Sequence, residues 1–495
     1  MAQPKAAMWL RVAVWTTLGL AALCGIAACI DVLAHDIPSD PVEPTILAAQ
    51  VGLSHGVPLY ASSSWQAPPY QVNLYGPVFY YLGAWALRGL GQGVSFLPGR
   101  LVSLCALMAC LAALWRFSRH HLQLPRAYAA GALVLSMGYP VVSMHAVLNR
   151  VDMVAVALAI CGFVLAQERG KKSWFSPVLL VLALYTKPTA IAAPAAVFMT
   201  RLWRNQRRAA MAFAVSCVAL AAIALAGLWL QSDGGFVTAV FVFNRNHLHV
   251  QGGLDRIQLA AAALTLPLAC ALALSSLANG KEMERPVSVY LLLATCVAFL
   301  VVLNVGAYLN VFLESGMIMG PVLSSVLFRQ RRNVEIHCVA LAAGAITLVA
   351  SARGLQDGHR DREERMGWEP ELRRIMTGKR VLTVDCSPAL RVGAELMVIE
   401  PYIFTRLVES HRIDPDAVLA MIREEKVDVI ATGTDLERGT APAWSPAMRE
   451  TILAHYRLRR AMGNDLFLYQ PRHVEPNPST DDPTRPARIA GSESE

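Results

Sequence analysis

Long apolar runs recur along this chain up to residue 352, and short clusters of Lys and Arg separate them. A helix that crosses a bilayer needs about 20 mostly apolar residues. Hydrophobic residues make up 55% of the chain and charged residues only 16%, whereas a soluble domain has roughly 25% charged residues. The sequence therefore predicts a polytopic α-helical membrane protein.

The apolar runs predict about eleven transmembrane helices. Several runs are shorter than about 20 residues, so these helices must tilt or include flanking residues. The first run contains "IAAC", ending at Cys29, which resembles a secretory signal, but the many later runs favour an uncleaved first span. The predicted spans are approximately 9–30, 101–115, 127–147, 151–167, 173–186, 188–203, 209–231, 257–278, 286–307, 310–328 and 334–352.

The basic clusters between the runs predict the topology. Cytoplasmic loops are enriched in Lys and Arg, so we place the clusters and the N-terminus in the cytoplasm, in a bacterial inner membrane. The same clusters account for the net charge of +8, which therefore predicts no nucleic-acid partner. The clusters are Arg116, Arg119 and Arg126; Arg169, Lys171 and Lys172; Arg201, Arg204, Arg207 and Arg208; Lys281 and Arg285; and Arg329, Arg331 and Arg332.

The first loop, residues 31–99, is predicted to be external because no Lys or Arg occurs between residues 12 and 87. Its segment 75–92 has an apolar part that is short for a crossing. We expect this segment to form a helix on the membrane surface, and a true crossing is the alternative.

Lys187 interrupts the apolar stretch "VLALYTKPTAIAAPAAVF" (181–198). An ammonium group inside the bilayer is costly, and Pro188 disfavours helix at the residue before it. Basic clusters flank residues 173–200 on both sides, so the stretch must turn on the external side. We therefore expect two spans that meet at Lys187, at the external face.

The composition changes after residue 352, which divides the chain into a transmembrane domain (1–352) and a further domain (353–473). Within 353–473, the segments 379–385, 427–433 and 464–470 read as strands and 414–426 reads as a helix. This pattern predicts a small α/β domain, and an odd number of spans places it outside the cytoplasm. Residues 474–495 have the composition of a disordered tail.

The unusual polar residues of the membrane part fall at the predicted external turns. Each has a structural alternative, such as a helix N-cap for Asp40 and Glu43, an ion pair of Arg150 with Asp152, or an interfacial position for Arg100. Their common side of the membrane nevertheless predicts one external site. Its candidate residues are Asp40, Glu43, Tyr75, Arg100, Arg150, Asp152, Lys187, Asn244, Arg245, His247, Asn310 and Glu314.

Carboxylates, a Lys and an Arg at an external membrane face suit group transfer from a lipid-linked phosphosugar. The acceptor hydroxyl needs a carboxylate base. The departing lipid phosphate needs cations where its charge develops. Its polyprenyl tail stays in the bilayer.

Several motifs also occur in a familiar order: "DPVEPTILAAQVGLSHGVPLY", "NLYGPVFYYLGAWALRGLG", "GRLVSL", "NRVDMVAVAL", "LALYTKPTAIAAP" and "YLNVFLE". In this order they resemble the GT-C glycosyltransferases, the superfamily of protein mannosyltransferases and lipid A aminoarabinose transferases. The resemblance covers about residues 9–330.

The resemblance implies a polyprenyl-phosphate sugar donor, an external active site and inversion at the anomeric carbon. The first-loop acid maps onto Asp40 or Glu43, and the spacing to Gly56, Leu59 and Tyr60 favours Glu43. A Pro and a Val separate the two carboxylates here, unlike the commoner Asp-Glu pair. The outer Lys that contacts donor phosphate maps onto Lys187.

One further assignment follows from the resemblance, and the others follow from the positions of the polar residues. The family's Arg-x-Asp turn maps onto Arg150 and Asp152. Arg100 is a further candidate for the donor phosphate, and Asp152, Tyr75, Asn244, Arg245, His247, Asn310 and Glu314 are expected to line or orient the pocket. Some relatives use a divalent metal, so Mg²⁺ or Mn²⁺ is left open here.

The sequence thus predicts an integral membrane glycosyltransferase, a hexosyl- or pentosyltransferase of cell-envelope biogenesis. Its expected partners are a polyprenyl-phosphate sugar, membrane lipid, and a glycan, lipid or protein acceptor. A transporter or flippase of lipid-linked saccharides is the main alternative, but it would distribute functional polar residues through the membrane depth. A non-catalytic membrane scaffold is a third class.

Overall fold

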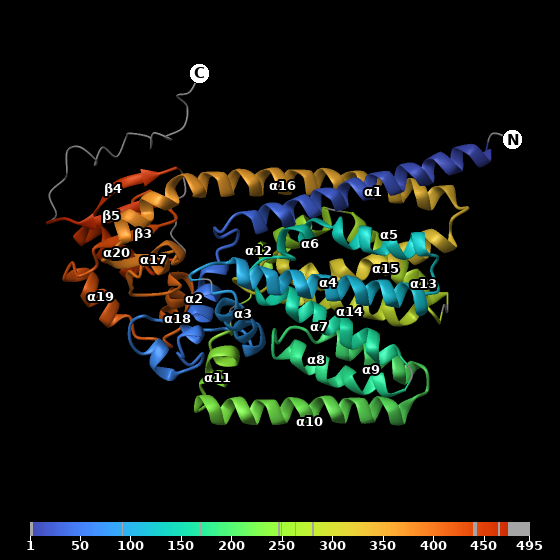
Figure 1. Ribbon diagram of the computed structural model, residues 1–495, viewed down its shortest axis with the longest axis horizontal. Coiled ribbons are helices and arrows are strands. Elements are labelled where there is room, and N and C mark those ends of the chain that lie inside the picture. Colours follow the sequence, from blue (N-terminus) through green and yellow to red (C-terminus); the bar gives the residue numbers. More distant parts are fainter. Residues whose placement is uncertain are drawn as a thin grey trace, which may run out of the picture.

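Most of the chain forms a bundle of helices that run along the long axis of the molecule, and a small sheet lies at one end of it (Figure 1). The computed structural model describes residues 3–473, apart from 92, 169, 246–247, 249, 263, 280–281, 439–442 and 464–465. His247 and the predicted tail 474–495 lie outside the described residues.

The helices of the bundle follow the predicted apolar runs. Their bounds are α1 (Gln3–Ala34), α4 (Leu97–His120), α5 (Arg126–Met137), α6 (Pro140–His145), α7 (Val151–Gln167), α8 (Ser176–Leu184), α9 (Ala192–Trp203), α10 (Arg207–Ser232), α12 (Val250–Ala262), α13 (Thr265–Ala278), α14 (Arg285–Val302), α15 (Leu313–Arg329) and α16 (Val334–Met376). Short turns η2 (Lys171–Phe175), α11 (Gly235–Val237), η3 (Thr238–Val242) and η4 (Leu309–Phe312) connect them.

Six helices are long and apolar enough to cross a membrane, or seven if the bent pair α12 and α13 counts as one span. The predicted polytopic helical class agrees with this finding, but the count of about eleven spans is not confirmed. The difference arises where a predicted run is broken or gives a short helix. Pro140 starts a new helix within the run 127–147, and α7, α8 and α9 have only 17, 9 and 12 residues.

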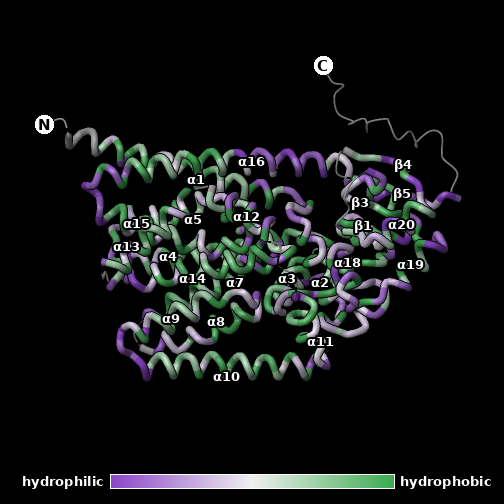
Figure 2. Tube along the Cα trace, turned by 180° about the vertical axis from the view of Figure 1, so that it is seen from behind, coloured by the Kyte–Doolittle hydropathy of each residue, from purple (hydrophilic) through white to green (hydrophobic). Residues whose placement is uncertain are grey.

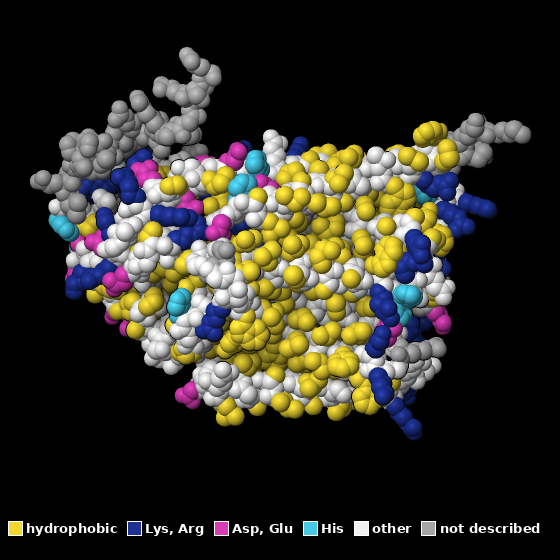
Figure 3. All heavy atoms as spheres, viewed as in Figure 1, with side chains coloured by type: hydrophobic (Ala, Val, Ile, Leu, Met, Phe, Trp, Pro, Cys, Tyr) yellow, Lys and Arg dark blue, Asp and Glu magenta, His cyan; other side chains and the backbone are white. Residues whose placement is uncertain are grey.

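A broad hydrophobic surface separates the sheet end from a margin of Lys and Arg at the opposite end (Figure 3). This margin contains the exposed Arg116, Arg126, Arg204 and Arg331, at the ends of α4, α5, α9 and α15. These residues belong to the clusters that we expect to face the cytoplasm. Their common end agrees with the predicted alternation, while the orientation in the membrane stays a prediction.

The first predicted external loop contains α2 (Glu43–Ser54), η1 (Ser62–Trp65) and α3 (Pro77–Gly89), all next to the sheet end (Figure 1). Helix α3 has 13 residues, so it is about 20 Å long at 1.5 Å per residue. A hydrocarbon core is about 30 Å thick. Helix α3 is therefore short for a crossing, and the surface position of segment 75–92 stays a prediction.

Helix α16 lies beside α1 along one edge of the molecule and leads into the sheet (Figure 1). Its first part is hydrophobic and the part nearer the sheet is hydrophilic (Figure 2). The helix is continuous from Val334 to Met376, so it runs through residue 352, where the composition changes. The division of the chain at 352 stays a prediction.

The sheet has five strands in the order β2-β1-β3-β5-β4. Strand β1 is parallel to β2 and β3, and β5 is antiparallel to β3 and β4. The three predicted strands and the predicted helix are confirmed as β1, β3, β5 and α19. The bounds are β1 (Arg380–Thr383), α17 (Ser387–Arg391), β2 (Glu395–Leu396), α18 (Pro401–Glu409), α19 (Asp416–Arg423), β3 (Val429–Thr432), α20 (Pro446–His455), β4 (Tyr456–Met462) and β5 (Leu466–Pro471).

The backbone of Tyr70, in the first loop, joins the sheet domain to the bundle. Its N–H donates to the carbonyl of Met397 (3.0 Å), and its carbonyl accepts from the N–H of Ile399 (2.9 Å). Arg391 adds an ion pair to Asp36 of the first loop (3.1 Å). These contacts fix the segment after β2 directly beside the first loop.

Candidate active site

Four charged side chains form a continuous chain where the first loop meets α7 and the turn before α9. Arg150 Nη1 donates to Asp40 Oδ1 (2.6 Å), and Arg150 Nε donates to Asp152 Oδ2 (2.9 Å). Lys187 Nζ donates to Asp152 Oδ1 (2.5 Å). Residues that are 147 positions apart thus share one buried ion network, while the external position of this network stays a prediction.

Local backbone structure places each member of this network. Arg150 is extended (φ −137°, ψ 154°) directly before α7, and Asp152 lies in the first turn of that helix, where the helix dipole favours a carboxylate. Lys187 follows the end of α8, and its N–H still bonds the carbonyl of Ala183 (2.9 Å). Pro188 prevents the helix from continuing, so the ammonium lies at a break between two helices.

The turn at Gly76 packs directly against this break. Gly76 N–H donates to the carbonyl of Thr186 (3.2 Å). A Cβ added at Gly76 would lie 1.8 Å from the carbonyl oxygen of Tyr185, so only glycine fits there. The neighbouring Tyr75 has an electrostatic contact with Arg150, and burial raises the pKa of its phenol to about 12. Tyr75 therefore borders the network as a neutral side chain.

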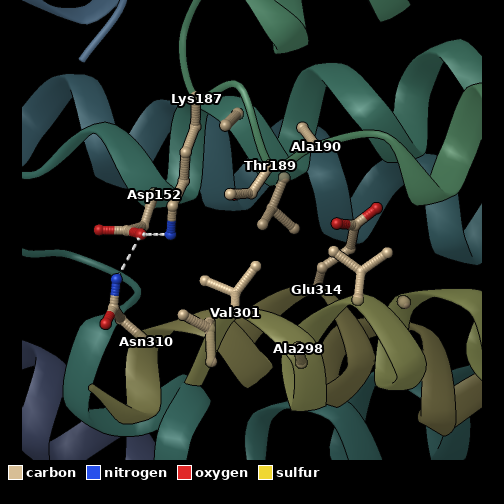
Figure 4. A pocket seen from close by; sticks show the side chains of 13 residues that line it. Asp152, Lys187, Thr189, Ala190, Ala298, Val301, Asn310 and Glu314 are labelled. Atoms are coloured by element: carbon tan, nitrogen blue, oxygen red, sulfur yellow. Dashed lines mark hydrogen bonds and ion pairs between the residues drawn. The ribbon is translucent and has the colours of Figure 1, made fainter. Parts of the chain in front are cut away.

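Asn310 of η4 reaches the network, whereas Glu314 of α15 lies on the other side of a narrow cavity from Asp152 and Lys187 (Figure 4). Asn310 Nδ2 donates to Asp152 Oδ1 (2.7 Å). The cavity has a volume of about 30 Å³ and lies beside the network. At one end it is lined by Asp152, Lys187 and Asn310, and at the other by Glu314, with apolar side chains of α14 between them (Figure 4). Glu314 accepts a hydrogen bond from Tyr290 (2.6 Å).

Glu43 has a different environment from Asp40. Arg100 donates to both oxygens of Glu43 (2.9 and 2.7 Å), and the two side chains are 0% and 1% exposed. Glu43 Oε2 also accepts from Ser39 N–H (2.8 Å), and Oε1 accepts from Asn149 N–H (2.6 Å). All four bonds hold Glu43 inside the protein, next to the residues that precede Asp40 and Arg150.

The two hydrogen bonds of the Asp40 carboxylate go to the same oxygen. Its Oδ1 accepts from Arg150 and from Val42 N–H (2.9 Å). Within the described part of the chain, no hydrogen bond reaches its Oδ2.

Asn244 and Arg245 lie apart from the network. Asn244 Nδ2 donates to the carbonyl of Leu74 (3.3 Å), and the carbonyl of Arg245 accepts from Arg412 (3.5 Å). Arg245 lines a separate cavity of about 170 Å³ with residues of α18. These two residues connect the 238–245 segment to the first loop and to the sheet domain.

Glu400 is a carboxyl group that the sequence does not single out. It directly precedes α18, bonds the side chain of Thr45, and has electrostatic contacts with Asp40 and Arg150. Burial raises its pKa to about 7. In the sequence, Glu400 is distinguished only as an acid between an apolar segment and Pro401. Its position in the fold depends on the backbone pairing of Tyr70 with residues 397–399.

His145 is a second residue that the sequence analysis does not include. It is 4% exposed, and neither ring nitrogen has a partner within the described residues. Electrostatic contacts connect it to Asp40, Arg150, Asp152 and Lys187. Its sequence signal is the same as that of Lys187, an ionisable side chain within an apolar run.

The residues of the network do not fit a divalent metal. The guanidinium of Arg150 lies between Asp40 and Asp152, and both oxygens of Asp152 are already bonded to cations or to Asn310. Over the residues that the structure describes, no group of three or more His, Cys, Asp or Glu side chains could hold a metal ion.

No protein-family model and no curated protein sequence matches the chain. Two solved structures show the same architecture. ArnT from Cupriavidus metallidurans, bound to undecaprenyl phosphate, is 13% identical over 91% of this chain and 97% of its own, with a TM-score of 0.57. The Archaeoglobus fulgidus oligosaccharyltransferase in the apo form is 12% identical over 94% of this chain and 75% of its own, with a TM-score of 0.56.

The chain has the GT-C fold. This finding confirms the resemblance predicted from the motif order. At such low identity the comparison concerns the fold alone. The oligosaccharyltransferase has also been solved with Zn and sulfate (TM-score 0.51), but in this chain the guanidinium of Arg150 lies between Asp40 and Asp152.

Proposed function

We propose that this GT-C chain is a membrane glycosyltransferase that moves a sugar from a polyprenyl phosphate to an acceptor hydroxyl on the extracytoplasmic face. The observation that carries the proposal is the ion network itself. Three successive ion pairs connect a carboxylate with one unbonded oxygen (Asp40) to an ammonium group (Lys187). Base and phosphate ligand are the two functions that such a transfer requires.

In the proposed step, the acceptor oxygen attacks the anomeric carbon of the donor sugar. Asp40 Oδ2 takes the proton from the acceptor hydroxyl as the new C–O bond forms. The bond between the anomeric carbon and the phosphate oxygen breaks, and the lipid phosphate leaves with the electron pair. Lys187 and Arg150 stabilise the negative charge on that phosphate, and attack from the opposite face inverts the anomeric carbon.

We assign Glu43 a positioning role rather than the role of base, which the motif spacing favours. Both of its oxygens accept from Arg100, and backbone N–H groups occupy them further. A carboxylate held in this way has no room for an acceptor hydroxyl. Through Ser39 and Asn149 it instead fixes the backbone beside Asp40 and Arg150.

Arg100 is also assigned to this positioning unit instead of the donor phosphate. Besides Glu43, its guanidinium donates to the carbonyls of Val32, His35 and Ile37, each at 2.6 Å. No donor group of Arg100 is left to face a phosphate. Asp152 orients both Arg150 and Lys187, and Asn310 holds Asp152.

The acceptor class that we propose is a cell-envelope glycan, lipid or protein, with the sheet domain shaping its site. A multi-span transporter or flippase of lipid-linked saccharides is the second candidate. The charged residues of the network gather at one end of the bundle, whereas a transport path needs access from both sides. This asymmetry favours the transferase. We place it in a bacterial inner membrane, with the N-terminus in the cytoplasm.

The direct test is transfer by purified protein, using a small panel of polyprenyl-phosphate sugars and envelope acceptors. The wild type is compared with Asp40→Asn, which keeps the shape but removes the base. Asp361→Asn, at an exposed position on α16, is the matched control. We expect transfer by the wild type and by the control only; full transfer by Asp40→Asn would overturn the assignment of the base.

A further inference from the structure

A wide cavity lies at the end of the bundle opposite to the candidate active site. Its volume is about 1,320 Å³, and it lies between the ends of α4, α7 and α9, the start of α8 and one face of α10. Pockets for drug-sized ligands measure roughly 300–1,000 Å³. The space is therefore large enough for a ligand with a long apolar part.

The wall that α10 contributes is apolar. Phe213, Leu220 and Ile223 line the cavity from this helix, which lies at the margin of the bundle (Figure 1). Only 11% of the apolar window of α10 is buried inside the protein. Lipid chains pack well against a wall of this kind, because it offers water few hydrogen-bond partners.

The rim of the cavity is basic. Arg201 Nη1 donates to the carbonyl of Ala209 (3.1 Å), and its guanidinium lies 4.9 Å from the ring centre of Phe213. Arg204 Nη1 donates to the amide oxygen of Gln167 (3.3 Å). Among the described residues, no carboxylate forms an ion pair with either arginine.

The other charged pair at the rim is already neutralised. Arg116 donates to both carboxylate oxygens of Glu168 (2.8 and 3.0 Å). Arg201 and Arg204 therefore leave a local positive charge beside an apolar wall. A guanidinium group presents a fork of donors that matches a phosphate.

We propose that this cavity binds an anionic glycerophospholipid of the leaflet at the α9–α10 turn. Its phosphate lies between Arg201 and Arg204, and an acyl chain lies along Phe213, Leu220 and Ile223 of α10. The lipid fills the space that separates α10 from α4 and α7. This site is separate from the proposed donor site, which lies at the other end of the bundle.

The test measures lipid binding to the purified full chain by native mass spectrometry, in detergent after delipidation. Dioleoyl phosphatidylglycerol is compared with dioleoyl phosphatidylcholine and with inorganic phosphate. We expect at least tenfold tighter binding of phosphatidylglycerol than of phosphatidylcholine, and an increase in Tm with phosphatidylglycerol only. Equal binding of the two lipids, or an equal effect of inorganic phosphate, would overturn the proposal.

Two variants test the two halves of the site. Arg201→Gln with Arg204→Gln removes the charge, and we expect it to lose the preference for phosphatidylglycerol. Ala219→Phe fills the apolar part without changing charge, and we expect it to lower binding of the same lipid at least tenfold. The fold of both is checked by Tm in phosphatidylcholine.

The matched control is Arg331→Gln with Arg332→Gln, which removes two charges at exposed positions of the same end, outside the cavity. It is expected to bind phosphatidylglycerol as the wild type does. An equal loss in this control would mean that net charge, and not the cavity, attracts the lipid. Unchanged binding by both cavity variants contradicts the proposal in the same way.

Discussion

Glu43 and Arg100 form a doubly hydrogen-bonded ion pair in the interior, with Arg100 Nε and Nη2 donating to the two carboxylate oxygens. They lie 57 residues apart in sequence, at the start of α2 and in the first turn of α4. Arg100 uses its remaining donors on three backbone carbonyls of residues 32–37. The pair therefore ties the end of α1, the first loop and α4 together.

Glu43→Gln is predicted to destabilise the protein rather than to remove a base. Removing one partner of a buried pair costs roughly 3–5 kcal/mol because the other charge is left uncompensated. We expect a clear decrease in Tm in Glu43→Gln, and a smaller additional decrease when Arg100→Gln is combined with it. Asp40→Asn also removes a charge from a buried pair, but Arg150 keeps Asp152 as a partner, so we expect a smaller decrease in Tm than in Glu43→Gln and a loss of transfer of roughly 100-fold or more.

These two variants distinguish the two carboxylates. If Glu43→Gln keeps wild-type stability but loses transfer, the positioning role that we assign to Glu43 is wrong.

The fold was predictable wherever hydrophobicity alone determines it. Long unbroken runs such as 209–231 appear as single long helices, here α10. The run 127–147 does not, because a new helix starts at Pro140, whereas Pro321 lies within α15 without ending it. The sequence also could not locate the end of α16, since its hydrophilic second half continues a helix that has already left the apolar part.

The site was predictable in part. Lys187 and Asp152 stand out because ionisable residues are rare in apolar sequence. Glu400 does not stand out in a charged domain, and its place beside Asp40 depends on backbone pairing between residues 70 and 397–399. The preference for Glu43 came from motif spacing, and spacing carries no information on which carboxylate forms an ion pair with an arginine.

Lys187→Met is predicted to decrease kcat more strongly than it changes KM. In the proposed step its ammonium stabilises the charge that develops on the leaving phosphate, and such contacts contribute roughly 100- to 1,000-fold in kcat. Lys187→Arg keeps the charge with a different geometry, so we expect partial activity. Steady-state kinetics with one donor lipid measures both. A large increase in KM at unchanged kcat would indicate ground-state binding only.

Transfer is predicted to be independent of divalent metal. The guanidinium of Arg150 supplies the positive charge between Asp40 and Asp152. We expect EDTA to leave the rate unchanged, and added Mg²⁺ or Mn²⁺ to have little effect. A loss of activity on chelation that Mn²⁺ reverses would contradict the role of Arg150, as would an unimpaired Arg150→Gln variant.

The free energy of unfolding is predicted to decrease as the pH rises, because Glu400 loses its proton. Burial raises the pKa of this carboxyl from 4.5 to about 7, so the folded state holds a proton that the unfolded state has released. The stabilisation is complete below about pH 4.5 and is lost as the pH rises to about 7. Glu400→Gln stays neutral and lacks this loss.

The Tm of Glu400→Gln should therefore rise relative to the wild type between about pH 5 and pH 8. A shift of this size corresponds to at most about 3 kcal/mol, at 1.36 kcal/mol per pKa unit. Glu409→Gln, the same change on the half-exposed end of α18, is the control for loss of charge. The contrary outcome is an equal Tm difference between Glu400→Gln and wild type at both pH values. It would show that Glu400 is ionised in the folded protein at both, with Thr45 and Arg150 stabilising its charge.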